Sequence, residues 1–235
     1  MNSFDKGILL LLNSYVGRWP LLDAVVVLWQ RNNLLSNAVF LAVICGLWFK
    51  VATTKRQQLE NRQTVFATFC ATLTAIAIAR LLAHLLPFRV RPAFAAELDF
   101  SVPAHANISG LLSWSAFPSD HAVVWFALAT GILLSDRSFG VLAVLCAGLN
   151  CLMRVYMGYH SPTDVIGGAV IGCALTWTLA RRSVRTVLWG PFEGLEVRSP
   201  GLFYCAAFLA LYEMSNMFDD VRAIATWAID YLHVV

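Results

Sequence analysis

Phe117-Pro118-Ser119-Asp120-His121 is the first of two stretches that decide the fold of this chain. The second is Arg154-Val155-Tyr156-Met157-Gly158-Tyr159-His160-Ser161-Pro162-Thr163-Asp164. Each stretch places a histidine at the mouth of an apolar helix, where free backbone N–H groups favour an anion. A third stretch, residues 87–92, adds Arg89 and Arg91 at another helix end. We expect the three stretches to meet at one membrane face and to form a site for a phosphate.

The composition around these stretches is that of a membrane protein. The chain has 235 residues, of which 59% are hydrophobic and 13% are charged, whereas a soluble domain usually carries about 25% charged residues. One membrane span needs roughly 20 apolar residues. The sequence therefore predicts an all-α, polytopic membrane helix bundle with about six transmembrane helices plus interfacial helices. We expect residues 1–235 to form a single membrane-embedded domain.

Apolar runs separated by charged connections give the expected order of the spans. The runs are residues 34–49, 64–86, 121–135, 139–156, 162–180 and 201–217, followed by an amphipathic segment at 221–235. The first thirty residues hold two short apolar pieces. They are compatible with a kinked span, or with an interfacial helix followed by a re-entrant one.

Basic residues fall in alternate connections. They are Lys50, Lys55, Arg56, Arg62, Arg137, Arg181, Arg182 and Arg185. By the positive-inside tendency these connections are cytoplasmic. The remaining connections, 87–118 and 157–161, then face outward, and both histidine stretches lie there.

Each histidine stretch also has an ordinary structural interpretation. Ser119 is a natural N-cap and Asp120 suits the first helical turn. Asp164 occupies the place of a capping-box acid. The same carboxylate could instead reach back to the imidazole of His160, fix its tautomer and make the other ring nitrogen a better nucleophile. Arg80 lies deep in an apolar run, and a structural and a site-supporting role both stay open for it.

The combined pattern resembles the signatures of the type-2 phosphatidic acid phosphatase superfamily. Arg154, five residues, His160, three residues and Asp164 match its last signature, Pro118 to His121 its Pro-Ser-x-His signature, and Arg91-Pro92 the end of its first. Two positions depart from the family pattern. His84 stands where the family usually has lysine, and Met153 where it usually has serine before the arginine.

The resemblance implies metal-free phosphoryl transfer in two steps without a cofactor. His160 attacks phosphorus and forms a phosphohistidine, Asp164 orients His160, and His121 protonates the leaving group and then activates water. Cations and N–H dipoles suit the charge on the equatorial oxygens. The candidate phosphate-binding residues are Arg91, Arg154, Ser119, Asp120, His84 and Arg89.

Within the superfamily, the chain looks most like bacterial undecaprenyl-pyrophosphate phosphatases. The resemblance then implies a lipid phosphate or pyrophosphate substrate, membrane lipids as partners, no nucleic acid, and an active site on the outer face of the bacterial inner membrane. Phosphatidylglycerophosphate phosphatases, lipid A phosphatases and phosphotransferases share the same catalytic residues and stay open as alternatives. So does a non-enzymatic membrane protein with residual signatures.

Overall fold

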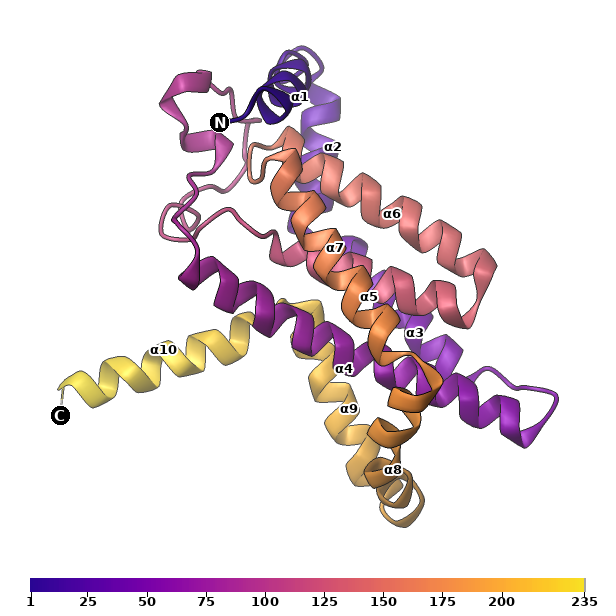
Figure 1. The fold of residues 1–235 in the computed structure, drawn as a ribbon. Coiled ribbons are helices and arrows are strands. Elements are labelled where there is room, and N and C mark those ends of the chain that lie inside the picture. The colour runs from indigo at the N-terminus through magenta and orange to yellow at the C-terminus, as the bar shows by residue number, and fades with distance from the viewer. Residues whose placement is uncertain (235) are drawn as a thin grey trace.

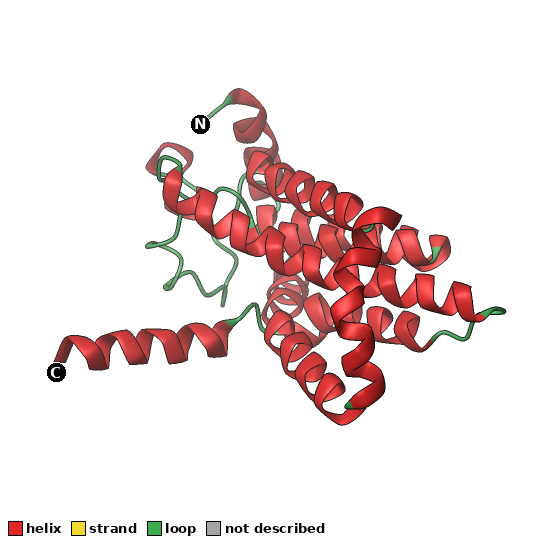
Figure 2. Cartoon of the chain, turned by 60° about the horizontal axis from the view of Figure 1, so that its bottom comes forward, coloured by secondary structure: helices red, strands yellow, loops and turns green. Residues whose placement is uncertain are grey.

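The computed structural model describes residues 1–234, and these residues form ten α-helices with short π- and 3₁₀-helical segments (Figure 1). The α-helices are α1 (Ser3–Asn13), α2 (Pro20–Arg31), α3 (Val39–Phe49), α4 (Lys55–Leu85), α5 (Asp120–Ser135), α6 (Arg137–Tyr156), α7 (Pro162–Leu179), α8 (Arg182–Arg198), α9 (Pro200–Ser215) and α10 (Asp219–Val234). The described residues contain no strand, so the all-α expectation is confirmed (Figure 2). The short segments are η1 (Leu34–Ala38), η2 (Pro92–Phe94) and η3 (Ala96–Leu98).

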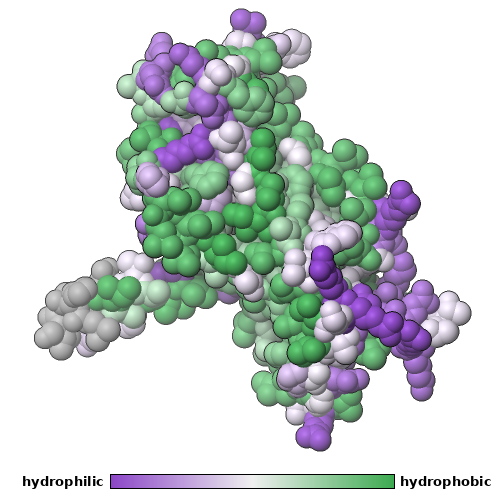
Figure 3. Space-filling view, in the orientation of Figure 1, coloured by the Kyte–Doolittle hydropathy of each residue, from purple (hydrophilic) through white to green (hydrophobic). Residues whose placement is uncertain are grey.

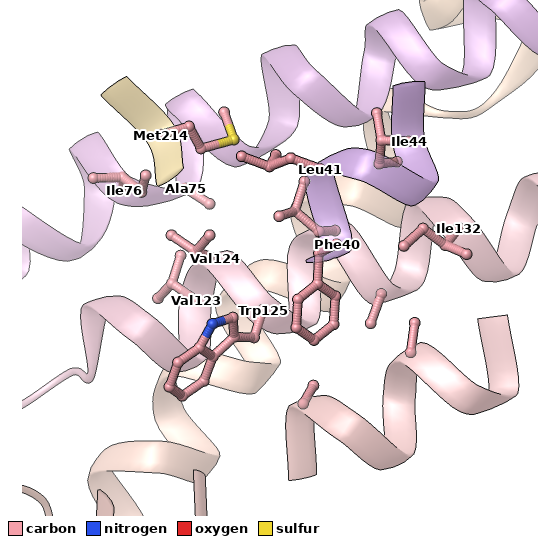
Figure 4. Packing of buried hydrophobic residues seen from close by; sticks show 14 of the residues in the cluster. Phe40, Leu41, Ile44, Ala75, Ile76, Val123, Val124, Trp125, Ile132 and Met214 are labelled. Atoms are coloured by element: carbon pink, nitrogen blue, oxygen red, sulfur yellow. The ribbon is translucent and has the colours of Figure 1, made fainter. Parts of the chain in front are cut away.

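Helix α5 lies at the centre of the bundle, where it packs against α4, α6 and α7. Its side chains are apolar on all sides, as expected for a helix surrounded by others. Figure 4 shows Val123, Val124, Trp125 and Ile132 of α5 packed with residues of α3, α4 and α9. Because α5 begins with the first histidine stretch, the core fixes the position of that stretch.

Helices α5 and α7 approach each other closely because glycine lies between them. A Cβ atom added at Gly168 would lie 2.5 Å from the carbonyl oxygen of Ser119. The backbone N–H of Ser119 also donates to the carbonyl oxygen of Asp164 at 3.1 Å. We call this paired contact the α5–α7 joint. It connects the starts of the two helices that carry the histidine stretches.

Three of the described helices, α4, α6 and α7, are long and apolar enough to cross a membrane. Helix α2 and residues 34–49 pass the same test together, bent by 71°, and α5 is a shorter apolar helix of 16 residues. The first thirty residues therefore form α1 and then α2, which is the first half of a bent pair, with a break at Gly17, whose φ is +78°.

Helix α4 begins nine residues before the expected span. Thr54 caps it, since its hydroxyl accepts from the N–H of Gln57 at 3.2 Å. Lys55, Arg56 and Arg62 therefore lie on the helix, not in a connection as the sequence suggested. Figure 3 shows hydrophilic surface at this end of α4 and near α1, with an apolar surface between them.

The C-terminal part adds α8, α9 and α10. Helix α8 contains Pro191 and was not expected from the sequence. Helix α9 packs against the bundle, whereas α10 extends away from the bundle (Figures 1 and 2). Residues Met214 and Met217 at the α9–α10 turn are buried in the main core. This turn brings the start of α10 next to the histidine stretches.

Candidate active site

A cavity of about 630 Å³ lies at the end of the bundle where the three stretches meet. Besides Asp219 and Arg222 of α10, six charged or imidazole side chains line it: Arg80, Arg91, Asp120, His121, Arg154 and His160. They come from α4, the connection before α5, the start of α5, the end of α6 and the turn before α7. The start of α10 completes the wall.

His160 is held from both sides of its ring. Its Nδ1 lies 2.9 Å from the carbonyl oxygen of Ala116, which can only accept, so Nδ1 carries the proton and Nε2 is left with its lone pair. The Nη1 of Arg91 lies 3.2 Å from Nε2 and also donates to the carbonyl of Tyr159 at 2.8 Å. Burial and then the Arg91 and Arg154 guanidiniums hold the pKa of His160 well below its ordinary value. The ring is therefore neutral near pH 7 and presents a free nitrogen.

Arg154 is 7% exposed and is placed by the N-terminal part of the chain. Its Nη1 donates to Oε1 of Gln30 at 3.3 Å, and its guanidinium lies 5.2 Å from the centroid of the Tyr159 ring. Within the part of the chain described, the Nε atoms of Arg154 and Arg91 are buried without a hydrogen-bond partner. A phosphate in the cavity would satisfy such donors.

The start of α5 supplies His121 and its neighbours. Ser119 is fully buried and caps the helix, with its hydroxyl facing the N–H of Ala122 at 3.5 Å. The carboxylate of Asp120 pairs with Nε of Arg80 at 2.6 Å. The ring of His121 packs edge-on against Trp125 at 5.3 Å. Of these residues, Asp120, His121 and Arg80 line the cavity and Ser119 lies behind it.

The carboxylate of Asp164 has different partners from those that the catalytic interpretation predicted. Its Oδ2 accepts from the backbone N–H of Ser161 at 2.6 Å, and its Oδ1 lies 2.8 Å from Nη1 of Arg89. The structure gives the Nδ1 of His160 a backbone carbonyl as its partner instead of this carboxylate. The expected direct contact between Asp164 and His160 is therefore corrected: Asp164 fixes the start of α7, and the carbonyl of Ala116 fixes the tautomer.

Arg89 and His84, both expected as phosphate contacts, lie away from the cavity lining. Arg89 is held by two carboxylates, because its Nη2 lies 2.6 Å from Oδ2 of Asp5 and its Nη1 faces Asp164. His84 is exposed, with its ring 6.4 Å from that of Trp114. Arg80, one helical turn earlier, faces the cavity in its stead.

Asp5 is a residue that the sequence did not single out. It is fully buried, and it accepts from the N–H of Thr163 at 2.9 Å and from the Thr163 hydroxyl at 2.6 Å. Burial opposes its ionisation, but the Thr163 hydrogen bonds and the Arg89 guanidinium outweigh burial and lower the pKa of Asp5. The available signal was an acid placed just before an apolar run, three residues after a capping Asn2.

Comparison with known proteins places this arrangement in a family. Residues 66–187, just over half of the chain, match the PAP2 superfamily. YbjG of Escherichia coli (strain K12), named as a proposed undecaprenyl-diphosphatase, is 30% identical over 146 residues, which cover 60% of this chain and 66% of that protein, just under two thirds of its length. The undecaprenyl-diphosphatase BcrC of Bacillus subtilis (strain 168) is 27% identical over 179 residues, which cover 75% of this chain and 81% of BcrC.

Other matches carry different names. A lipid A 4′-phosphatase of Bacteroides thetaiotaomicron is 41% identical over 58 residues, which cover 24% of this chain and 26% of that protein. The crystal structure of a transmembrane PAP2-type phosphatidylglycerolphosphate phosphatase from Bacillus subtilis has the same fold, with a TM-score of 0.52 and 20% identity, and covers 78% of this chain and 85% of its own. The membrane helices, the cavity and these matches agree, and the chain is a multi-pass membrane protein that belongs to the PAP2 superfamily.

Proposed function

We propose that the protein hydrolyses a lipid pyrophosphate, with undecaprenyl pyrophosphate converted to undecaprenyl phosphate, through a phosphohistidine on His160. The observation that carries this proposal is the buried, neutral His160, whose Nε2 faces Arg91 in a cavity shared with His121 and Arg154. The whole chain, residues 1–235, would act as one membrane-embedded domain.

The first chemical step uses the lone pair of His160 Nε2. It attacks the terminal phosphorus while the bond from phosphorus to the bridging oxygen breaks. His121 gives a proton to the departing oxygen, which leaves as the lipid monophosphate. Arg91 and Arg154 hold the equatorial oxygens of the transferring group, where the charge is concentrated. As the ring becomes cationic, its Nδ1–H bond to Ala116 strengthens.

The second step returns the enzyme to its starting state. His121, now neutral, removes a proton from water, and the water oxygen attacks phosphorus as the P–N bond breaks. Inorganic phosphate leaves, and His160 regains its lone pair. An imidazole can both give and accept a proton, and the negative charge of a bound phosphate favours its protonated form. Asp164 and Arg89 act by positioning the turn that carries His160, whereas Ser119 starts the helix that carries His121.

The names of two relatives support a diphosphate of a long-chain lipid as the substrate, and the position of the cavity supports the side of the membrane. YbjG and BcrC, whose sequences match 60% and 75% of this chain, are both named for undecaprenyl-diphosphatase activity. The cavity opens at the end of the bundle opposite the basic connections, which the positive-inside tendency assigns to the cytoplasm. A headgroup can enter it from water while the tail stays in lipid. We therefore propose the outer face of the bacterial inner membrane as the site of reaction.

Phosphate release by the purified protein tests this function. Undecaprenyl pyrophosphate, phosphatidylglycerophosphate and lipid A are supplied separately, in metal chelator, to the wild type and to His160→Ala. We expect release from the pyrophosphate and a loss of roughly 10³-fold or more in the variant. His105→Asn is the matched control, because His105 lies in an exposed loop with a φ of +67° that asparagine tolerates.

The identity of the products separates the alternatives. Free phosphate supports hydrolysis, whereas phosphate found on an added acceptor lipid shows a phosphotransferase. Faster release from lipid A or phosphatidylglycerophosphate overturns the proposed substrate. Equal activity of the wild type and His160→Ala shows that no phosphohistidine at this position is needed, and favours a membrane protein with residual signatures.

A further inference from the structure

We propose that Arg80 and Arg222, beside Asp120, form a second phosphate subsite, which binds the phosphate of a diphosphate lipid that His160 does not attack. This inference rests on the proposed function and goes further by naming what distinguishes a diphosphate from a monophosphate. Both arginines line the same cavity as His160 and His121. Arg222 lies on α10, outside the part of the chain that matches the PAP2 superfamily.

The cavity contains two groups of cations. Arg91 and Arg154 lie beside His160, and within the described part of the chain their close contacts are with neutral groups: carbonyl oxygens, the imidazole and an aromatic ring. Arg80 and Arg222 form the other group, and their guanidiniums lie 5.2 Å and 6.0 Å from the same Trp114 ring. Two cations on one ring repel each other, and an anion between them relieves that repulsion.

Asp120 connects the two groups. Its carboxylate is paired with Arg80 at 2.6 Å and interacts electrostatically with all four cavity arginines: Arg80, Arg222, Arg91 and Arg154. It is also the residue directly before His121 in the chain. An anion held at Arg80 and Arg222 would therefore lie in the same cavity as His160 and His121.

Both arginines keep donors for a ligand. The ion pair of Arg80 with Asp120 uses Nε, and the pair of Arg222 with Asp219 uses Nη2. A guanidinium has five N–H donors, so each side chain retains several after one carboxylate contact. Arg80 and Arg222 are also only partly buried, at 23% and 38% side-chain exposure, and can reach a ligand in the cavity.

The part of the cavity wall that α10 forms suits an amphiphilic ligand. Arg222, Thr226 and Ile229 all line the cavity, and their spacing of four and three residues puts them on one face of the helix. The wall thus changes from cationic to apolar along that face. The phosphate groups of a lipid would lie at Arg222 and its chain would extend past Ile229.

The test compares farnesyl diphosphate with farnesyl monophosphate, two short-chain lipids that differ by one phosphate. For the wild type, Arg222→Gln and Arg80→Gln, the measured quantity is the ratio of kcat/KM for the diphosphate to that for the monophosphate. We expect each variant to lower this ratio roughly ten- to hundred-fold, as expected for the loss of charge-assisted hydrogen bonds. Arg222→Lys should restore part of the ratio. The matched control is Arg137→Gln at the opposite end of the bundle, which should leave the ratio unchanged.

Binding to a variant that cannot turn over gives an independent measurement. His160→Ala and His160→Ala/Arg222→Gln are titrated with each farnesyl compound, after thermal unfolding has shown that both variants fold. If the diphosphate binds more tightly than the monophosphate and Arg222→Gln removes this difference, the subsite is supported. This holds even if the wild type releases no phosphate, a result that would overturn only the proposed hydrolase. If Arg222→Gln leaves the preference for the diphosphate unchanged, either with no loss or with an equal loss for both compounds, the subsite is overturned while the proposed hydrolase stands.

Discussion

Two terminal helices, α1 and α10, flank the same site but contact the rest of the protein in different ways. Helix α1 places Asp5 fully inside, where it bonds Thr163 at the start of α7 and pairs with Arg89. Helix α10 reaches the cavity with the partly exposed Arg222 and then leaves the bundle (Figure 1). The comparison indicates that α1 supports the geometry of the site, whereas α10 offers contacts to a ligand. Both lie outside residues 66–187, so the matched region alone does not complete the site.

The largest expected effect is that of Asp5→Ala. It leaves Arg89 and the Thr163 N–H without their partner, and removing one member of a buried ion pair costs about 3–5 kcal/mol. We expect the free energy of unfolding to fall by about that amount, and phosphatase activity to fall with it, because the turn bearing His160 loses its support. Thermal unfolding in detergent and phosphate release measure the two effects. Glu97→Gln is the control, since its side chain is 59% exposed. A variant with normal stability and activity would show that α1 is not an anchor.

A smaller loss is expected when an apolar contact of α1 is removed. Leu9 is fully buried against Leu98 and Val155, and Leu9→Ala should lower the free energy of unfolding by about 2–4 kcal/mol. Ile224 on α10 is 66% exposed, and Ile224→Ala should change it by no more than about 0.5 kcal/mol. Similar losses in both variants would contradict the distinction between the two helices.

The pH dependence of stability should reveal the contribution of the Asp5 carboxylate in α1. The pKa of Asp5 is lower in the folded protein than its ordinary value, so its stabilising contribution is present above about pH 3.9. That contribution is lost as the pH falls through the folded pKa. The difference in unfolding free energy between the wild type and Asp5→Asn should therefore shrink as the pH falls below about 3.9. A difference that stays constant on acidification would show that folding does not lower the pKa of Asp5.

Deletion of α10 after Phe218 should also change the stability very little. The buried turn residues Met214 and Met217 are retained, so the free energy of unfolding should change by about 1 kcal/mol or less. The preference for farnesyl diphosphate over farnesyl monophosphate should fall as it does in Arg222→Gln. A large loss of stability would assign α10 the same supporting role as α1.

The sequence predicted the centre of this site better than its surroundings. Ser119 and Ser161 begin helices as their local patterns require, and both histidines reach the cavity region because apolar runs of fixed length end at one depth. Such patterns depend on neighbours along the chain. The positions of Arg89 and Asp164 depend on Asp5, which is more than eighty residues away. No local pattern distinguishes an arginine that pairs with a distant carboxylate from one that faces a ligand. Arg89 was therefore expected at the phosphate together with Arg91, although the family signature includes only Arg91.

The same limitation applies to α1, α2 and α10. Asp23 accepts the Tyr156 hydroxyl, and Gln30 accepts from Arg154, so α2 is tied to the end of α6 by side chains whose partners lie far along the chain. The sequence left the course of the first thirty residues open because their apolar runs are too short to specify a span. A role for Arg222 of α10 could be recognised only in the structure, where the α9–α10 turn brings this residue to the cavity.

The α5–α7 joint has a consequence for how the substrate range of this protein can change. Ser119 bonds Asp164 through the backbone, and Gly168 leaves no room for a side chain between the helices. The two imidazoles are therefore held at a separation that substitutions elsewhere in the bundle cannot readily alter. New headgroups would be accommodated by changing the rim, where α10 and the connection before α5 contribute replaceable side chains, while the reacting centre keeps its dimensions.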